Sequence, residues 1–325
     1  MGVKFDLVYM DSNKRDQGIL QDFSFDLAYG EDENDFELKV NAKDHVCGVS
    51  YMPYIEGTEY GGRIDAIKSD TAAGTVTYIG RTWHGILEGK VITPDPGQDY
   101  YTVSGEANTI IGNVITRLGL TGLFTASGDD SGITISSYKF DRYIKGYSGL
   151  KKMLKKAGAK LITTFENGMV TLSAEPITDY SQTDEFDSDQ VAMVIKKIYQ
   201  GTNHLICLGS GELSERTVVN LYVEEDGTIG TTQYFFGMDE ITDVLDYPNA
   251  ESTEELTKKG VEQLTKAAGK GELSVKFDAT QNFDIGDIIE AKDIVTGISV
   301  KETVSKKIVS IQSEEIKVSY NIKEV

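Results

Sequence analysis

The stretch that decides the fold lies near the C-terminal end: Phe283-Asp-Ile-Gly-Asp-Ile-Ile-Glu290, followed by Val304-Ser-Lys-Lys-Ile-Val-Ser-Ile311 and Ile316-Lys-Val-Ser-Tyr-Asn-Ile322. Apolar and polar residues alternate with a period of two in the last two segments, which is typical of half-buried strands. The polar residues 312–315 between them predict a turn, so the two segments form a hairpin. Gly286-Asp287 places another turn before a strand at 288–291. This segment therefore predicts a small antiparallel barrel or sandwich.

The chain up to about residue 92 has the same β character. Residues 19–28 and 35–40 alternate on either side of an acidic loop at 29–34, which predicts a second hairpin. That loop lacks the central glycine and terminal glutamate that an EF-hand needs in register, so we expect no calcium site there. Further strands are expected at 49–52, 62–67 and 75–83.

From residue 95 to about 185 the pattern becomes mixed. Pro94-Asp-Pro-Gly97 interrupts regular structure, and helical spacing of apolar residues then predicts a helix with Asn108 as its N-cap and Gly119 as its end. Short strands follow at 122–125 and 132–136, and a second helix runs from Ser148 to Gly158. Asn167-Gly168 between two apolar segments is a strong hairpin signal. This region reads as an inserted α+β domain.

The region after the acidic linker at 184–189 returns to strands, at 191–199, 204–209 and 218–223, with a turn at Asp226-Gly227. Ser252-Thr-Glu-Glu255 is a capping box and predicts a helix at about 253–268. Gly260 flattens one side of that helix, which suits close packing on a sheet.

A faint internal repeat links the two β regions. Arg63-Ile-Asp-Ala-Ile67 aligns with Lys307-Ile-Val-Ser-Ile311, and Val76-Thr-Tyr78 aligns with Val318-Ser-Tyr320. We therefore expect a mainly β, α+β protein with two similar small tube-like β-barrel domains and an inserted α+β domain. The expected ranges are 1–94 for the first barrel, 95–185 for the insert and 186–325 for the second barrel with its helix. Parts of 186–250 could instead complete the first barrel or the insert.

The composition is strongly acidic, with 52 Asp and Glu against 32 Lys and Arg, a net charge of −20 in 325 residues. Wrapping of nucleic acid needs a basic surface, so that class is excluded. An acidic wall suits a conduit along which a polyanion slides, although acidity can also serve solubility alone. No segment approaches the roughly 20 apolar residues that cross a bilayer. Cys47 and Cys207 are expected to be buried free thiols.

Catalytic and metal-binding patterns are missing from the sequence. His45, His84 and His204 stand alone without metal-ligand spacing, and no nucleophile elbow, P-loop or dinucleotide fingerprint occurs. The single tryptophan, Trp83, is expected to anchor a barrel core or edge. We therefore assign no catalytic, cofactor-binding or metal-binding residue and expect no cofactor and no enzymatic activity.

The order of several loose motifs nevertheless resembles that of a known family. They are Gly80-Arg-Thr-Trp-His-Gly-Ile-Leu87 with the segment to Pro94, Tyr101–Asn108, Gly146–Leu150, Asn203–Gly211 and Phe283–Ile289. Together they resemble the baseplate hub or tail-tip proteins of long-tailed bacteriophages, especially of actinobacterial and firmicute siphophages and related prophages. The resemblance covers most of the chain in the right order.

The resemblance implies a homotrimeric ring at the virion tail tip, made in the bacterial host cytoplasm without a membrane anchor. Such a ring closes the distal end of the tail tube, contacts the tube or distal tail protein and the tape-measure protein, and lets DNA pass without sequence-specific binding. Many relatives carry a C-terminal lysin or receptor-binding extension, whereas this chain ends at Val325, so a separate spike, fibre or lysin protein is expected to supply those activities. The alternatives are a tail-associated cell-wall hydrolase and a carbohydrate-binding tail protein that uses Tyr143, Tyr147 or Trp83 as platforms.

Overall fold

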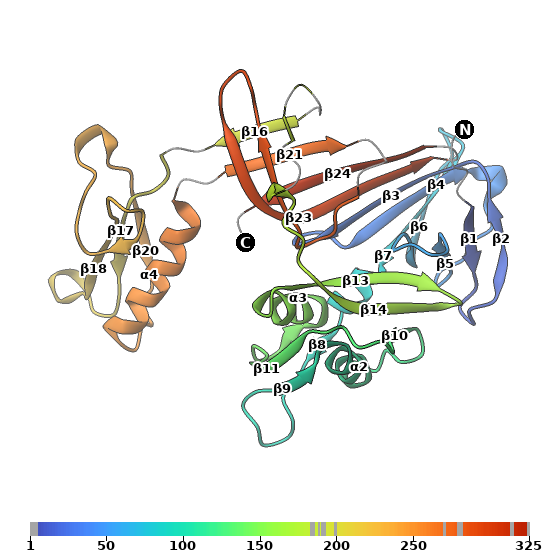
Figure 1. Cartoon of the computed structure of the whole chain (residues 1–325), viewed down its shortest axis with the longest axis horizontal. Coiled ribbons are helices and arrows are strands. Elements are labelled where there is room, and N and C mark those ends of the chain that lie inside the picture. The colour runs from blue at the N-terminus through green and yellow to red at the C-terminus, as the bar shows by residue number, and fades with distance from the viewer. Residues whose placement is uncertain are drawn as a thin grey trace. The chain divides into compact units, whose positions relative to one another are not determined.

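The computed structural model describes residues 6–182, 186–187, 189, 193–197, 200–268, 271–277, 282–312 and 315–323 (Figure 1). The chain divides into two compact units: the first comprises Met1–Val194 and Leu273–Lys323, and the second comprises Ile195–Glu272. Expectations for residues 183–185, 188, 190–192, 198–199 and 313–314 lie outside the described residues. The finer division expected at residues 94 and 185 stays a prediction.

A long sheet contains strands from near both ends of the chain; most of its strands belong to the first unit, and β16 crosses the unit boundary at residue 194. Its strand order from one edge is β16-β21-β24-β23-β3-β4-β7-β6, and β22 pairs with both β15 and β23. The bounds of these strands are β3 Phe23–Gly30, β4 Asp35–Asn41, β6 Gly62–Asp70, β7 Thr75–Thr82, β15 Phe186–Asp187, β16 Met193–Lys197, β21 Gly271–Phe277, β22 Ile288–Lys292, β23 Ser299–Gln312 and β24 Glu315–Lys323.

The hairpins predicted at both ends of the chain are present, β3–β4 and β23–β24, each antiparallel. They are not separate bodies, because β23 pairs antiparallel with β3 from Lys306 opposite Gly30 to Gln312 opposite Ser24 (Figure 1). The described strands form a mainly β, α+β fold, but they close no barrel, so two barrel domains are not confirmed. The repeat is matched in part, since Tyr78 and Tyr320 are both buried whereas Ile64 is buried and Ile308 is exposed.

Two further differences concern the N-terminal region. Residues 19–28 are not one strand, because Gln21-Asp22 separates β2 from β3. A short helix, α1 (Trp83–Glu88), ends the β region before residue 92, capped by the Thr82 hydroxyl, which accepts a hydrogen bond from the Gly85 N–H. A small sheet in the order β2-β1-β5 completes this part, with bounds β1 Leu7–Met10, β2 Asp16–Leu20 and β5 Met52–Tyr54.

The segment from residue 91 to 176 is α+β, as expected. The Asn167-Gly168 turn connects β13 and β14 with both residues at positive φ, 52° and 74°, as a two-residue hairpin turn requires. The other elements are β8 Val91–Ile92, β9 Thr102–Glu106, α2 Ala107–Arg117, β10 Phe124–Ala126, β11 Thr134–Lys139, β12 Ile144–Lys145, α3 Gly146–Lys156, β13 Ala159–Glu166 and β14 Met169–Pro176.

Both helix starts in this segment differ from the prediction. The N-cap of α2 is Glu106, whose carboxylate accepts hydrogen bonds from the N–H groups of Asn108 and Thr109. Asn108 is buried and instead bridges Asp129 and Ala174. The second helix begins at Gly146, two residues before Ser148. Glutamate is rarer than Asn or Ser at the N-cap position, so the sequence pattern favoured Asn108 over Glu106 as the N-cap of α2.

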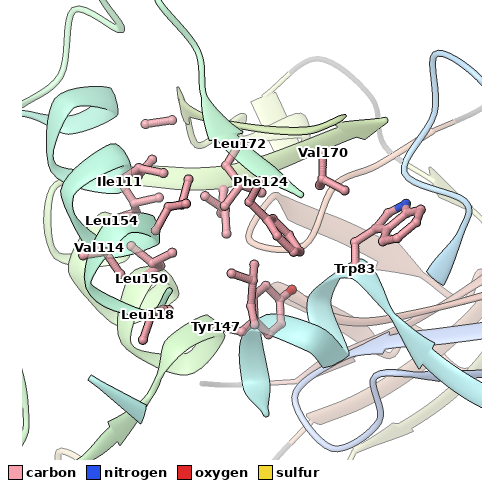
Figure 2. Close-up of a cluster of buried hydrophobic side chains, with 14 of the residues drawn as sticks. Trp83, Ile111, Val114, Leu118, Phe124, Tyr147, Leu150, Leu154, Val170 and Leu172 are labelled. Atoms are coloured by element: carbon pink, nitrogen blue, oxygen red, sulfur yellow. The ribbon is translucent and has the colours of Figure 1, made fainter. Parts of the chain in front are cut away.

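A hydrophobic core of the first unit lies between these helices and β13–β14 (Figure 2). Trp83 is fully buried at the end of this core that lies nearest the long sheet. Its ring stacks on Phe165, with the ring centroids 5.1 Å apart. It is an anchor, as expected, but in the core of the α+β segment. Burial of Phe124, Tyr147 and the leucines of α3 supplies the apolar area that holds this layer together.

The second unit is a four-stranded sheet covered on one face by α4 (Thr253–Ala267). The predicted capping is present, because the Ser252 hydroxyl accepts a hydrogen bond from the Glu255 N–H. Gly260 packs directly on the sheet: a Cβ there would lie 2.5 Å from atoms of Cys207 and Leu221. The strand order is β19-β18-β17-β20, with bounds β17 His204–Leu208, β18 Val218–Val223, β19 Ile229–Gly230 and β20 Thr242–Asp246.

Candidate functional site

A lysine with no exposed surface, Lys307, marks the most unusual site in the first unit. It lies on β23, in register with Tyr29 of β3 and Tyr320 of β24. A bulge between Val304 and Lys306 turns its side chain to the inner face, which otherwise carries apolar residues. A buried ammonium group is costly unless charged and polar partners surround it.

Glu59 and Asn282 are the partners of Lys307. The Nζ atom lies 2.6 Å from Oε1 of Glu59 and 2.6 Å from Oδ1 of Asn282. Burial lowers the pKa of Lys307, but the negative charge of Glu59 with Tyr60 and Tyr320 nearby raises it above its ordinary value overall. The lysine is therefore charged at all physiological pH values.

The loop that carries Glu59 is fixed on β13. The Gly57 N–H donates to the Phe165 carbonyl at 2.9 Å, and the Phe165 N–H donates to the Thr58 carbonyl at 2.8 Å. These bonds place residues 55–61 between the α+β segment and the long sheet. Glu59 therefore links two parts of the first unit that are far apart in sequence.

His84 of α1 lies beside the same carboxylate. Its Nε2 atom is 3.9 Å from Oε2 of Glu59, and its ring stacks on Tyr29 with centroids 4.9 Å apart. Burial lowers the pKa of His84 to about 4 against the opposing charge of Glu59, so the ring is neutral at pH 7. Its Nδ1 atom has no hydrogen-bond partner within the described part of the chain.

A second buried ion pair holds the opening stretch of the C-terminal module. Nζ of Lys160, on β13, lies 2.7 Å from Asp284 and 2.9 Å from both carboxylate oxygens of Asp287. Asp287 also accepts hydrogen bonds from the N–H groups of Thr178 and Asp284. Burial lowers the pKa of Lys160, but these two carboxylates raise it overall. The turn before β22 is thus fastened to the α+β segment by charge.

Glu59 of the first ion pair and Asp284 of the second line one cavity of about 210 Å³, together with His84 and Asn282. We call this arrangement the polar junction, defined by Glu59, His84, Lys160, Asn282, Asp284, Asp287 and Lys307. The buried hydroxyl of Thr163 also lines the cavity and has no hydrogen-bond partner among the described residues. Each carboxylate of the junction forms an ion pair with a lysine. Its ion pairs hold three segments of the first unit together.

The candidate glycan platforms are mostly inaccessible. Trp83 and Tyr147 are buried in the core, and Tyr143 alone is exposed, with the Arg142 guanidinium 5.3 Å from its ring centre. The expectation that Trp83 or Tyr147 could stack on a sugar is therefore wrong.

The other candidate residues have structural partners. Nδ1 of His45 lies 2.8 Å from the Tyr78 hydroxyl, and Nδ1 of His204 lies 2.6 Å from Glu240. Both cysteines are buried free thiols. Lysines surround the acidic loop at 29–34, since Lys306 pairs with Glu33 at 2.6 Å and Lys151 donates to the Gly30 carbonyl.

Sequence reasoning missed the polar junction. Its one local signal is the pair Lys306-Lys307 in an alternating strand, where one of two adjacent lysines must face inward. Among the residues that the structure describes, no group of His, Cys, Asp and Glu side chains is arranged to hold a metal ion. Within the described ranges, no helix is both long and apolar enough to cross a membrane.

Solved structures with a similar fold are tail proteins. The tail protein of Neisseria meningitidis MC58 aligns over 99% of this chain and 97% of its own, with a TM-score of 0.53 and 12% identity. The 43 kDa tail protein of prophage MuSo2 from Shewanella oneidensis aligns over 98% of both chains, with a TM-score of 0.53 and 10% identity.

A chain from the baseplate of phage P2 in its activated conformation gives the same TM-score over 98% of both chains, at 10% identity. No protein-family model and no curated protein matches the sequence. The resemblance to baseplate and tail-tip proteins is therefore confirmed for the fold, over nearly the whole chain.

Proposed function

We propose that this chain is a non-enzymatic structural hub of a phage or phage-like tail. In this proposal three copies form a ring that closes the distal end of the tail tube and adapts a six-fold tube to a three-fold tip. DNA passes through the ring during infection. The protein would be located at the virion tail tip or baseplate.

The observation that carries this proposal is the coverage of the fold match. The three tail and baseplate chains align with 98–99% of this chain, and this chain covers 97–98% of each of them. A match of that extent includes both compact units and the order in which they are connected. It supports a common architecture rather than one shared domain.

The charge and the polar junction give further support. A net charge of −20 suits a ring through which a polyanion passes without binding. The ion pairs of Lys160 and Lys307 fasten the C-terminal strands to the rest of the first unit, which suits a rigid structural part. The two tube-like β domains remain a prediction; the strand groups β3–β7 and β22–β24 are the candidates.

The proposed partners follow from the position of such a ring. One face would contact the distal tail protein or the last tube ring, and the tape-measure protein would end inside. The other face would carry a separate spike, fibre or lysin protein. None of these contacts requires a short motif, since broad complementary surfaces are sufficient.

Negative-stain imaging of the purified full chain, alone and mixed with the tube and distal tail proteins encoded with it, tests the proposal. The expected result is a three-fold ring with a central hole that caps tube ends. A chain that stays monomeric at high concentration and does not attach to tubes would overturn it.

Assaying the same preparation on purified peptidoglycan tests the hydrolase alternative. We expect no clearing. Clearing that Glu59→Gln or Asp284→Asn abolishes, with folding retained, would make the chain an enzyme and contradict the structural proposal.

A further inference from the structure

Two polar side chains converge on the buried nitrogen atom of Lys307. This residue has no exposed surface, and its Nζ atom lies 2.6 Å from Oε1 of Glu59 and 2.6 Å from Oδ1 of Asn282. The ring centres of Tyr60 and Tyr320 lie 5.7 Å and 5.9 Å from the same atom. An amine, a side-chain amide and a carboxylate therefore share one largely desolvated site. A nucleophile, an acyl group and a proton carrier are the groups needed to form a new amide bond.

The amide of Asn282 presents its carbonyl group to the lysine. Lys307 donates a hydrogen bond to Oδ1, and the Tyr320 hydroxyl donates another at 3.3 Å. Because an ammonium group has no acceptor, the oxygen and not the nitrogen of the amide faces Nζ. A C=O bond is about 1.23 Å long, so Nζ lies within about 3.8 Å of Cγ. This separation is close to the roughly 3–3.5 Å of a near-attack arrangement.

We propose that Lys307 and Asn282 form an isopeptide bond within the chain, with Glu59 as the proton-transfer group. The lone pair of Nζ attacks Cγ of Asn282, and the electron pair of the C=O bond moves to Oδ1. The Cγ–Nδ2 bond then breaks and releases ammonia, which leaves a secondary amide between the two side chains. The reaction needs no cofactor or oxidant and occurs once per chain, so it agrees with a structural protein that turns over no substrate.

Glu59 carries the protons that this reaction must move. In the ion pair, Lys307 is an ammonium ion without a lone pair for the attack. Transfer of one proton over 2.6 Å to Glu59 gives a neutral amine and a neutral acid, and burial lowers the cost of this neutral state relative to water. The carboxyl group then gives a proton to Nδ2 and takes one from Nζ. Ammonium, carboxylate and primary amide thus become a secondary amide, ammonia and a carboxylic acid, so atoms and charge balance.

Tyr320 lies where negative charge develops during the attack. Its hydroxyl accepts a hydrogen bond from the Phe283 N–H at 3.1 Å and donates to Oδ1 of Asn282. Burial raises the pKa of Tyr320 to about 12, so the hydroxyl keeps the proton that it donates. Such a donor stabilises the oxyanion of the tetrahedral intermediate. Asn282 is an exposed residue that lines the cavity of about 210 Å³, so ammonia has a path to solvent.

The bond would staple the C-terminal part of the long sheet. Asn282 and Lys307 are 25 positions apart, so the bond closes a loop that contains β22 and the first half of β23. Like a disulfide, it restricts the unfolded chain, but it forms in a reducing compartment as well. The inference goes beyond the proposed ring and does not depend on it.

Intact mass spectrometry of the denatured full-length chain tests the bond. We expect a mass about 17 Da below that of the sequence, because one ammonia is lost. Peptide mapping should show that trypsin no longer cleaves after Lys307 and that a branched peptide joins Lys307 to Asn282. The preparation is measured when freshly purified and after prolonged incubation at neutral pH.

Four variants separate the roles of the side chains. Asn282→Ala and Lys307→Arg should keep their full mass, since each lacks one of the bonded groups. Glu59→Gln and Tyr320→Phe should each slow the loss of ammonia by about 100-fold or more. Asn282→Ala changes an exposed residue and keeps the ion pair of Lys307 with Glu59, so it covers the case in which the other variants do not fold.

Asn321→Ala is the matched control. Asn321 lies directly opposite Lys306 in the β23–β24 pair, so it is another asparagine beside a lysine of the same strand. This variant should lose ammonia at the wild-type rate. Loss of ammonia that requires Asn321 would overturn the assignment to Asn282.

Two results would overturn the inference as a whole. One is a folded wild-type chain that keeps its full mass after the incubation. The other is a loss of ammonia that persists in Lys307→Arg, because the backbone then attacks an asparagine and forms a succinimide. Rings that assemble without the bond would leave the proposed function standing, whereas a bonded chain that forms no ring would leave only this inference.

Discussion

Lys307 shows how much of the first unit depends on single residues. Lys307→Met leaves the mostly buried Glu59 without its ammonium partner, so we expect a loss of about 3 kcal/mol in the free energy of unfolding, measured by urea denaturation. Lys306→Met, one residue away, removes a pair with the half-exposed Glu33 and should cost less than about 1 kcal/mol.

The double variant Lys307→Met with Glu59→Gln distinguishes two causes of the lost stability: the missing ion pair, and the unpaired charge left on Glu59. We expect it to recover more than half of the loss, because the buried carboxylate is gone. Equal costs at 306 and 307 would contradict the role assigned to the junction.

His84 makes stability depend on pH. Its pKa is about 4 in the folded protein, against about 6.5 in an unfolded chain, so between these values the unfolded state binds more protons. Stability therefore falls as pH decreases from about 6.5 to 4, by about 3 kcal/mol from this residue. Below that window the contribution is fully lost.

Urea denaturation at several pH values between 4 and 7, with His84→Gln for comparison, measures this effect. Carboxylates also titrate in that range, so the difference in slope between the two proteins is the quantity of interest. If the free energy of unfolding depends on pH in the same way in both proteins, burial does not keep the imidazole of His84 neutral.

Two helices, α2 and α4, each contain a glycine at which helix propensity and side-chain packing can be compared. Glycine within a helix is normally less stable than alanine by about 0.5–1 kcal/mol. In α2, an alanine Cβ at position 112 would lie 3.6 Å from Ala126, an ordinary contact, so Gly112→Ala should stabilise by that amount. In α4, the same change at Gly260 would place Cβ 2.5 Å from Cys207 and Leu221. Gly260→Ala should therefore destabilise, by about 1–3 kcal/mol.

Thermal denaturation of both glycine variants is the measurement. Opposite signs are expected, with circular dichroism confirming that both proteins fold. Stabilisation by both substitutions would mean that α4 is not closely packed on its sheet.

Most elements could be predicted from the sequence where a local pattern determines them. Asn167-Gly168, the alternation in β23 and β24, and Ser252 as the N-cap of α4 each act within a few residues, and each was predicted correctly. The second hydrogen bond expected of a capping box differs, because the Glu255 carboxylate accepts from the Glu251 N–H. Helix α1 was missed because the strand pattern of β7 continues into Trp83 without a break. Its only start signal is the hydroxyl of Thr82.

The polar junction could not be predicted because its members are joined by tertiary structure. Glu59 and Lys307 are 248 residues apart, and no periodicity relates them. The aligned residues Ile64 and Ile308 differ in burial, since Ile64 is buried and Ile308 is exposed, and both strands carry a bulge near these positions. The three segments meet only when β23 pairs with β3.

At the scale of the whole molecule, the two compact units should unfold separately. Each has its own buried cluster, with Leu205, Leu221, Leu256 and Leu264 in the second unit. We expect two transitions in urea, resolved by hydrogen exchange with mass spectrometry. Gly260→Ala should shift only the transition of residues 195–272, and Lys307→Met only the other. A single transition shifted by both variants would contradict this division.

The pairing of β3 with β23 also has a consequence for synthesis. Strand β3 ends at residue 30 and β23 ends at residue 312, so 282 residues are translated between the two partners. At a translation rate of about 5–20 residues per second, β23 is synthesised on the order of 15 to 60 s after β3, and this edge of β3 stays unpaired during that time. During that time a nascent chain exposes an unpaired strand that other nascent chains can bind. Production of this protein is thus sensitive to translation speed and to chaperones that cover strand edges.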